Sequence, residues 1–311
     1  MRPTHGPAVA AALLLDALVG EPPEGMHPTV WMGRATSAYE KRALKPKDPR
    51  TRRAAGVLLA ASLPTLAFLS ARALLGLAPR PLRPALEVAL ISTTLSMRGL
   101  AAAAGSVRGE LAGDGLEAAR ARVGEFVGRD TANLTTGGVC RAAVESVAEN
   151  TSDGVVGPMF YGFLFGAPGA LAYKAMNTLD SMVGYRHGPY LELGWAGARL
   201  DDLANLVPAR LTVLAAAAAS GSPAKTLATA LRYGPLSSSP NAGHAEAAFA
   251  GALGLRLGGT NVYGGVARAG TVLGDGRAPV ADDIGRAIAL MRRLCALLAL
   301  LALIAGRGRR G

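Results

Sequence analysis

Residues 54–76 form a largely apolar run of roughly twenty residues, the length that an α-helix needs to cross a bilayer core of about 30 Å. Half of the 311 residues are hydrophobic, and only 18% are charged. Further candidate spans are 8–19, 86–100, 155–176, 203–220 and 288–305. We therefore expect an all-α, polytopic integral membrane helical bundle that forms a single membrane-embedded domain over residues 1–311.

The apolar segment 155–176 is interrupted midway by the sequence GAPG at 166–169. Each half has about ten residues, too few to cross the bilayer alone. One interpretation is a re-entrant helical hairpin, which would return residues 177–180 to the side where Asn150 and Asp153 lie. The other interpretation, a long tilted helix kinked at Pro168, remains open at this point.

Residues 105–129 are the most soluble part of the chain, because apolar residues recur there at helical spacing among charges. This pattern predicts an amphipathic helix outside the bilayer, within an extramembrane helical region at 105–150. A simple count of crossings places the segment 239–265 on the opposite side from the acidic residues near 145, unless another segment re-enters.

The formal net charge of +11 favours attraction to anionic membrane lipids or to an anionic substrate such as a nucleotide. Basic residues concentrate in 34–53, which predicts a cytoplasmic loop. No nucleic-acid module is recognisable, so no nucleic acid partner is expected. Cys140 and Cys295 lie far apart in sequence, and they support neither a disulfide framework nor a cysteine metal site.

Acidic and amide side chains are threaded between apolar runs in residues 137–210. They are Glu145, Glu149, Asn150, Asp153, Asn177, Asp180, Asp201, Asp202 and Asn205. Such groups are costly in lipid unless they are paired or hydrogen-bonded, so their concentration in one stretch predicts the active region of a membrane enzyme.

Glu145 and Glu149 stand four residues apart, which places both carboxylates on one face of a helix, with Asn150 and Asp153 at the next turn. Two neighbouring anions repel unless a positive charge lies between them. Mg²⁺, which binds through a few carboxylates, waters and substrate phosphates, is one such charge. The alternative is a solvated helix end that carries acidic residues.

Further along, Lys174, Asn177 and Asp180 recur at three-residue spacing and predict one polar stripe on a helix. Lys174 suits a phosphate as a point charge, although an ion pair between Lys174 and Asp180 explains the same pattern. Asp201 and Asp202 precede an apolar helix, so they are either functional acids or favourable charges at a helix N-terminus.

Several other polar residues have both a structural and a functional interpretation. Asp130, after Arg129, either caps a helix or takes part in the chemistry. His27 is either a hydrogen-bond partner or a base, and Ser239 and Asn241 lie in a predicted turn. No G-x-x-x-x-G-K-[ST] loop is present, so any nucleotide is bound without that phosphate cradle.

Several motifs occur in a fixed order between about residues 16 and 284. They are HPTVWMGR, RDT, VESVAENTSDGVVGPMFYG, YKAMNTLDSMVGY, ARLDDLANLVPARL, SPNAGHAEAAFAGALGLRLGG and a following YGG. With them the chain resembles the membrane-bound cobalamin-biosynthesis family CobD/CbiB, the adenosylcobinamide-phosphate synthases. One departure is that Gly20, Glu21 and Pro22 stand where the family pattern has Gly-Asp-Pro.

The resemblance implies a multi-pass protein of the cell (inner) membrane that uses ATP and Mg²⁺. It would join a corrinoid, adenosylcobyric acid, to aminopropanol or aminopropanol phosphate through an amide bond. Family membership assigns no role to individual acids, so the following roles are hypotheses. Glu145, Glu149 and Asp153 would hold Mg²⁺, and Asp180 or Asp202 would take the amine proton or hold a second metal.

The hypothesis also assigns residues to substrate binding, with Lys174 or Arg210 holding a phosphate. The set is His27, Arg129, Asp130, Asn150, Lys174, Asn177, Arg210, Ser239 and Asn241. Two other classes remain open: a Mg²⁺-dependent membrane prenyl or alcohol-phosphate transferase, and a membrane transporter or signalling protein. Assembly into a homo-oligomer is also open.

Overall fold

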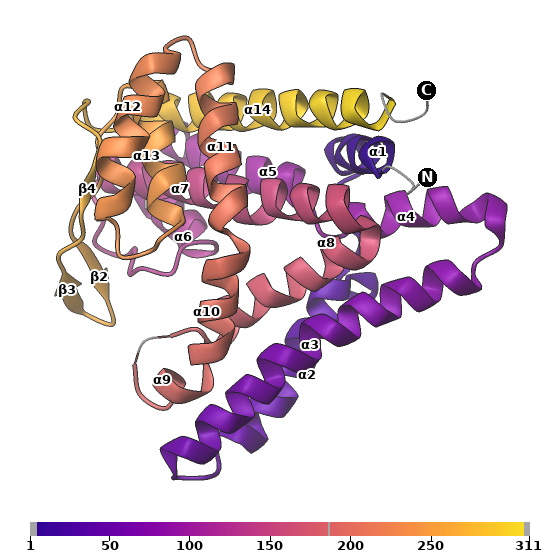
Figure 1. The fold of residues 1–311 in the computed structure, drawn as a ribbon. Helices are drawn as coiled ribbons and strands as arrows, with labels where there is room; N and C mark the ends of the chain where they lie inside the picture. The colour runs from indigo at the N-terminus through magenta and orange to yellow at the C-terminus, as the bar shows by residue number, and fades with distance from the viewer. Residues whose placement is uncertain (1–4, 186, 308–311) are drawn as a thin grey trace. The chain divides into compact units, whose positions relative to one another are not determined.

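The computed structural model describes residues 5–185 and 187–307, and most of these are helical (Figure 1). The strands among them form two short antiparallel pairs: β1 (Leu257–Gly258) with β4 (Val272–Leu273), and β2 (Asn261–Tyr263) with β3 (Val266–Arg268). The predicted all-α class is confirmed. The chain divides into two compact units, described in turn, and the single membrane-embedded domain stays a prediction.

Unit 1 comprises Met1–Ser96, Gly157–Asn205 and Ala299–Gly311. Its helices are α1 (Gly6–Leu18), η1 (Glu24–Met26), α2 (Pro28–Ala43), α3 (Pro49–Leu77), η2 (Arg80–Leu82), α4 (Arg83–Ser92), α8 (Gly157–Val183), α9 (Tyr190–Leu193), α10 (Trp195–Ala204) and the end of α14 (Ala281–Arg307). Prolines begin α2 and α3, where the missing N–H is harmless and the fixed φ suits a helix.

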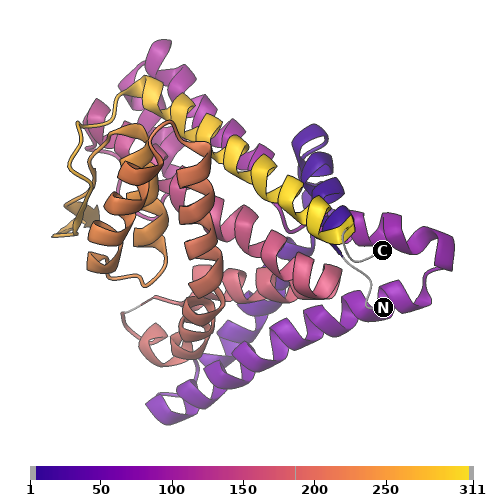
Figure 2. The same cartoon turned by 45° about the horizontal axis from the view of Figure 1, so that its top comes forward.

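Helix α8 is a hairpin of two helical arms, which Figures 1 and 2 show joined at a bend. Gly166 has φ 69° and ψ −160° at this bend, a conformation that glycine adopts without strain. The rings of Tyr161 and Tyr173 stack 5.1 Å apart, and a Cβ on Gly157 would lie 2.3 Å from the Tyr173 ring. In a straight helix, residues 157 and 173 would be about 24 Å apart, so the predicted hairpin is confirmed and the kinked single helix is wrong.

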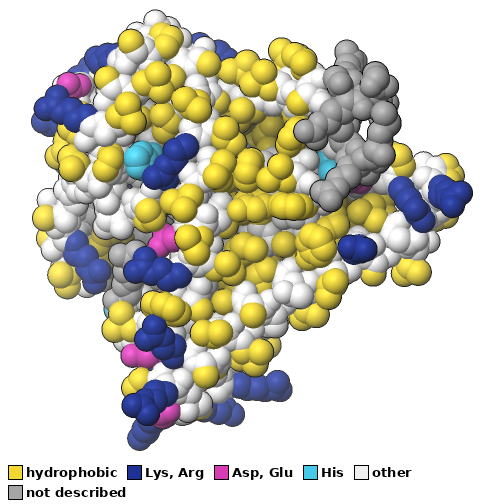
Figure 3. All heavy atoms as spheres, viewed as in Figure 1, with side chains coloured by type: hydrophobic (Ala, Val, Ile, Leu, Met, Phe, Trp, Pro, Cys, Tyr) yellow, Lys and Arg dark blue, Asp and Glu magenta, His cyan; other side chains and the backbone are white. Residues whose placement is uncertain are grey.

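Within the described residues, four helical stretches are long and apolar enough to cross a membrane, and α10 with α11 (Leu206–Ala219) makes a fifth if the bent pair is one span. The four are Pro49–Leu77, Arg80–Ala112, Thr136–Val183 and Ala281–Gly306. Along α3, Leu58, Leu66 and Leu69 are exposed, which suits lipid contact. Figure 3 shows hydrophobic side chains along this helix and Lys and Arg gathered at its lower end. These features fit a multi-pass membrane protein.

The predicted span 86–100 lies within the candidate span Arg80–Ala112. This stretch is interrupted between α4 and α5 (Met97–Ala112), where the hydroxyls of Ser92, Thr93 and Thr94 donate to carbonyls of the preceding turn. The first predicted span, 8–19, is the thirteen-residue α1, which is shorter than a spanning helix.

Unit 2 comprises Met97–Val156 and Leu206–Leu298. Besides the strands and the first part of α14, it contains α5, α6 (Leu116–Gly124), α7 (Thr136–Thr151), the π-helical turn η3 (Ser152–Val156), α11, α12 (Pro223–Tyr233), η4 (Gly234–Leu236) and α13 (Ala242–Leu253). The amphipathic helix predicted at 105–129 is two helices, because the chain turns at Gly115 with φ 90°. No helix was expected from the sequence where α12 and α13 occur.

Alanine at position 166 should destabilise the hairpin, because its Cβ would meet Glu87 Oε1 at 2.5 Å and the φ of 69° is strained for any residue with a side chain. We expect Gly166→Ala to lower the free energy of unfolding by about 1–3 kcal/mol, measured by thermal unfolding in detergent. Gly105→Ala is the matched control, because its Cβ would meet nothing within 4 Å. Equal melting temperatures for the two variants would contradict this role of Gly166.

Candidate active site

A cavity of about 360 Å³ in unit 2 gathers most of the acidic residues predicted near position 145. Its wall includes Glu145 and Glu149 from α7 and Glu246 from α13. Arg129, from the loop before α7, and the serines 237–239 also line it. The two α7 carboxylates share the cavity because they lie one turn apart. The simple crossing count, made for the case that no further segment re-enters, is wrong for this part of 239–265, because Ser239, Ala242 and Glu246 line the same cavity as these acids.

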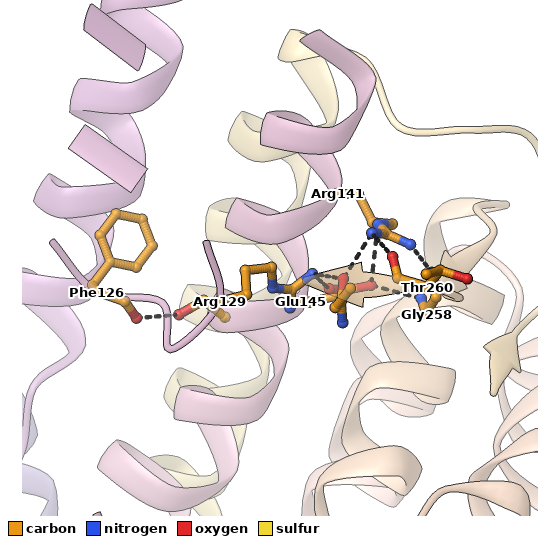
Figure 4. A network of polar contacts seen from close by, with 8 residues as sticks. Phe126, Arg129, Arg141, Glu145, Gly258 and Thr260 are labelled. Carbon is orange, nitrogen blue, oxygen red and sulfur yellow. Dashed lines mark hydrogen bonds and ion pairs between the residues drawn. The ribbon is translucent and has the colours of Figure 1, made fainter. Parts of the chain in front are cut away.

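The side chain of Glu145 is only 4% exposed and has several polar partners (Figure 4). Arg129 Nη1 lies 2.6 Å from Oε2, and the backbone N–H of Gly258 donates to Oε1 at 2.6 Å. Arg141 Nε lies 3.8 Å from Oε1. A buried carboxylate needs such partners to offset the loss of its hydration, so Glu145 already has positive charge beside it.

Glu246 was not among the predicted site residues. Burial raises its pKa well above the ordinary value of 4.5, and Glu149 and Glu145 raise it further. The available signal was one carboxylate within the otherwise apolar run AEAAFAGAL of α13. A local excess of negative charge of this kind favours binding a cation or a proton.

The β2–β3 hairpin forms part of the cavity wall and is held by the RDT motif. Arg129 Nη1 donates to Asn261 Oδ1 at 2.9 Å, and Asp130 Oδ2 accepts the N–H of Gly265 at 2.7 Å. Gly264 and Gly265 both have positive φ, as the two-residue turn requires. Asp130 therefore has a structural partner in the hairpin, and its predicted contact with substrate stays a prediction.

Arg210, Ser239 and Asn241 come together at the start of α13. Arg210 Nη1 donates to Pro240 O and Asn241 Oδ1, both at 2.9 Å, and its Nη2 lies 3.3 Å from His244 Nε2. Ser239 Oγ accepts the N–H of Ala242 at 3.1 Å. Burial and then Arg210 lower the pKa of His244, so His244 stays neutral and can accept from the guanidinium. The predicted phosphate contact of Arg210 is untested.

Asn150 and Asp153, which were predicted at the turn after Glu149, are not among the described residues that line this cavity. Asn150 Nδ2 donates to Ser146 O at 3.0 Å within its own helix, and Asp153 lies in the π-helical turn η3. Over residues 5–185 and 187–307, no group of three or more His, Cys, Asp or Glu is arranged to hold a metal ion. The Mg²⁺ site of Glu145, Glu149 and Asp153 stays a prediction.

In unit 1, the buried acid of the Asp-Asp pair is Asp201, which was not chosen from the sequence. Its carboxylate accepts from Asn205 Nδ2 at 3.0 Å and lies 3.5 Å from Asn177 Nδ2. Asp202 instead pairs with Arg199 at 3.2 Å, and Asp180 lies against Gly184. The structure thus gives Asn177 a protein partner, and the catalytic roles of Asp180 and Asp202 remain predictions.

A second cavity, of about 300 Å³, lies within unit 1 and is lined by Glu21, His27 and Lys174. His27 Nδ1 accepts the N–H of Thr29 at 3.2 Å and so caps α2, while Nε2 lies 3.4 Å from Glu21 Oε2. The hydrogen bond from His27 lowers the pKa of Glu21, and Lys174 lowers it further. Glu21, which stands where the family pattern Gly-Asp-Pro has aspartate, is thus the carboxylate that lies beside His27.

Helices long and apolar enough to cross a membrane, together with an acidic cavity, define a polytopic membrane protein with a polar site. Comparison with known proteins identifies the family. The family model described as CobD/Cbib protein matches residues 9–291, and the chain belongs to this family. No solved structure matches the chain.

Three curated relatives illustrate the similarity. The cobalamin biosynthesis protein CobD of Geobacter metallireducens is 44% identical, over 96% of both chains. CobD of Synechocystis is 40% identical, over 96% of this chain and 92% of the relative. The cobalamin biosynthesis protein CbiB of Salmonella typhimurium is 42% identical, over 95% of both chains.

Removing the charge of Glu145 should leave Arg129 and Arg141 facing an uncharged group in a buried place. We expect Glu145→Gln to lower the free energy of unfolding by about 3 kcal/mol, because breaking a buried pair strands its partners. The double variant Arg129→Gln, Glu145→Gln should lose less than the sum of the two single variants. Thermal unfolding in detergent measures all three, and strictly additive losses would contradict the coupling.

The raised pKa of Glu246 makes stability depend on pH. The folded protein holds this proton at pH values above 4.5 where the unfolded chain has released it. Stability therefore falls as pH rises from that value through the raised pKa. Melting temperatures from about pH 5 to pH 8 should fall less steeply in Glu246→Gln than in the unaltered protein. Parallel pH profiles would show that Glu246 titrates as an ordinary glutamate.

Proposed function

We propose that this protein acts in cobalamin biosynthesis as an ATP- and Mg²⁺-dependent ligase of the cell membrane. It joins adenosylcobyric acid to aminopropanol or aminopropanol phosphate through an amide bond. The names of the relatives support the pathway. The observation that carries the site is the cavity in which Glu149 and Glu246 lie together beside Arg129.

The cavity residues fit Mg²⁺ by their chemistry. Mg²⁺ prefers oxygen ligands and commonly takes only one or two protein carboxylates, with waters and substrate phosphates completing its shell. Glu149 and Glu246 offer two carboxylates, and the raised pKa of Glu246 indicates negative charge that a cation would offset. When bound, Mg²⁺ neutralises the phosphate charge of ATP during activation of the carboxylate.

Other residues of the cavity orient the site. Glu145 is committed to Arg129 and to the N–H of Gly258, so it positions the loop and the strand that carry them. Asn261 and Tyr263 of the hairpin complete part of the wall. Amide formation requires that water be kept from the activated carboxyl group, because water competes with the amine for it, and bound substrates would have to cover the open side of this cavity.

The amine substrate suits the second cavity, in unit 1. Lys174 offers a point charge for a phosphate, and Glu21 offers a carboxylate for an ammonium group. A small zwitterion such as aminopropanol phosphate carries both groups. Asp180 and Asp202 remain our candidates for taking the proton that the amine releases when its nitrogen bonds to the carbonyl carbon and the phosphate or adenylate leaves.

The test is amide formation by purified protein with adenosylcobyric acid, ATP and Mg²⁺, run with each amine. We expect Glu149→Gln and Glu246→Gln each to lower kcat by about 100-fold or more, because each removes a carboxylate from the metal. Glu125→Gln is the matched control, because Glu125 is exposed and pairs with an exposed arginine. Full activity in both cavity variants would refute the site, and no product from the unaltered protein would refute the reaction.

A further inference from the structure

A third cavity, of about 520 Å³, lies in unit 2 and shares Gly258 and Gly259 with the acidic cavity. Its wall also includes Thr135 and Gly138 near the start of α7, and Arg141 and Arg256. The proposed reaction assigns this cavity no role. Its charge differs from that of its neighbour, because two arginines and no aspartate or glutamate are among the described residues that line it.

The two arginines are held differently. The Arg141 guanidinium donates to Gly258 O, to Thr260 O at 3.0 Å and to Asn261 Oδ1 at 2.8 Å, so its orientation is fixed (Figure 4). Arg256 is exposed, and its guanidinium makes no hydrogen bond or ion pair with the described part of the chain. Arg141 is therefore held in place by protein acceptors and lies beside Glu145, whereas the guanidinium of Arg256 is available to a ligand.

Glycines leave the cavity wall without side chains where a ligand would approach the backbone. Gly258 and Gly259 have φ values of 72° and 88°, which other residues rarely adopt, and a Cβ at Gly259 would lie 3.1 Å from Arg141 Nη1. Gly138 lies in the first turn of α7, where Thr135 Oγ1 accepts its N–H at 3.1 Å. The positive end of this helix adds to the charge of the arginines.

We propose that this cavity binds a polyphosphate anion, the phosphate chain of a nucleoside triphosphate. Guanidinium groups match the geometry and charge of phosphate oxygens, and the volume exceeds what a single phosphate fills. The shared wall of Gly258 and Gly259 sets this anion beside the carboxylates that suit Mg²⁺. The anion site rests on the geometry, whereas its assignment to ATP rests on the proposed function.

The test is calorimetric titration of the purified full chain in neutral detergent with inorganic triphosphate. We expect Arg256→Gln to weaken binding about tenfold or more, because it removes a charge-assisted contact, and Arg256→Lys to weaken it less. Arg232→Gln is the control, because Arg232 is an exposed arginine of the same unit outside the cavity. Melting temperatures verify that the variants fold. If triphosphate does not bind, or binds with the same affinity to Arg256→Gln as to the unaltered protein, the proposal is overturned.

An anionic lipid head group carries the same phosphate chemistry, so the titration is repeated with phosphatidylglycerol in the detergent. Triphosphate binding that persists and still depends on Arg256 supports a soluble polyphosphate. If lipid binding depends on Arg256 and triphosphate binding does not, the proposal of a polyphosphate site is overturned.

Amide formation, measured in the same variants, separates this site from the proposed reaction. Triphosphate binding that depends on Arg256 without any amide product leaves the site standing and refutes the ligase. If amide formation and triphosphate binding are both unchanged in Arg256→Gln, the anion site is refuted and the ligase stands.

Discussion

The ion pairs of Glu145 are the interactions on which the arrangement of unit 2 depends. One carboxylate from α7 receives Arg129 on one oxygen and the N–H of Gly258 on the other. Arg129 and Arg141 in turn both donate to Asn261, so the helix, the loop before it and the strand region form one network. A buried carboxylate without these partners would be strongly unfavourable, so the network must form as a whole.

Unit 1 is built around a different constraint, the need to turn an apolar chain back on itself. Gly166 supplies the turn of α8, and stacking of Tyr161 on Tyr173 holds the two arms together. Tyr173 also donates to Asn205 Oδ1 at 2.6 Å, and Asn205 donates to Asp201. The hairpin therefore carries a buried chain of polar groups that satisfy one another, the condition for broken helices at membrane depth.

The sequence predicted most of the membrane helices and the shared helix face of Glu145 and Glu149, because apolar length and four-residue spacing are local signals. It did not place Ser239 beside these acids, because that proximity comes from tertiary packing. It did not predict Glu246, because that carboxylate reaches the cavity only through a tertiary contact between α13 and α7. Asp202 was predicted as a site residue in place of Asp201, because nothing in the sequence shows that Asp201 is buried and that Asp202 pairs with Arg199. The break at Ser92–Thr94 was missed because hydroxyl bonds to the preceding turn compete with helix formation.

The two cavities of unit 2 divide charge across a wall of two glycines. Three glutamates lie on one side with Arg129 among them, and Arg141 and Arg256 lie on the other. Arg141 donates to the carbonyl of Gly258, while the N–H of Gly258 donates to Glu145. The backbone of Gly258 thus links a carboxylate on one side to a guanidinium on the other through hydrogen bonds, and such connected bonds polarise one another. A ligand that presents a metal ion to one side and phosphate oxygens to the other matches both halves, whereas a bare cation or a bare anion matches only one.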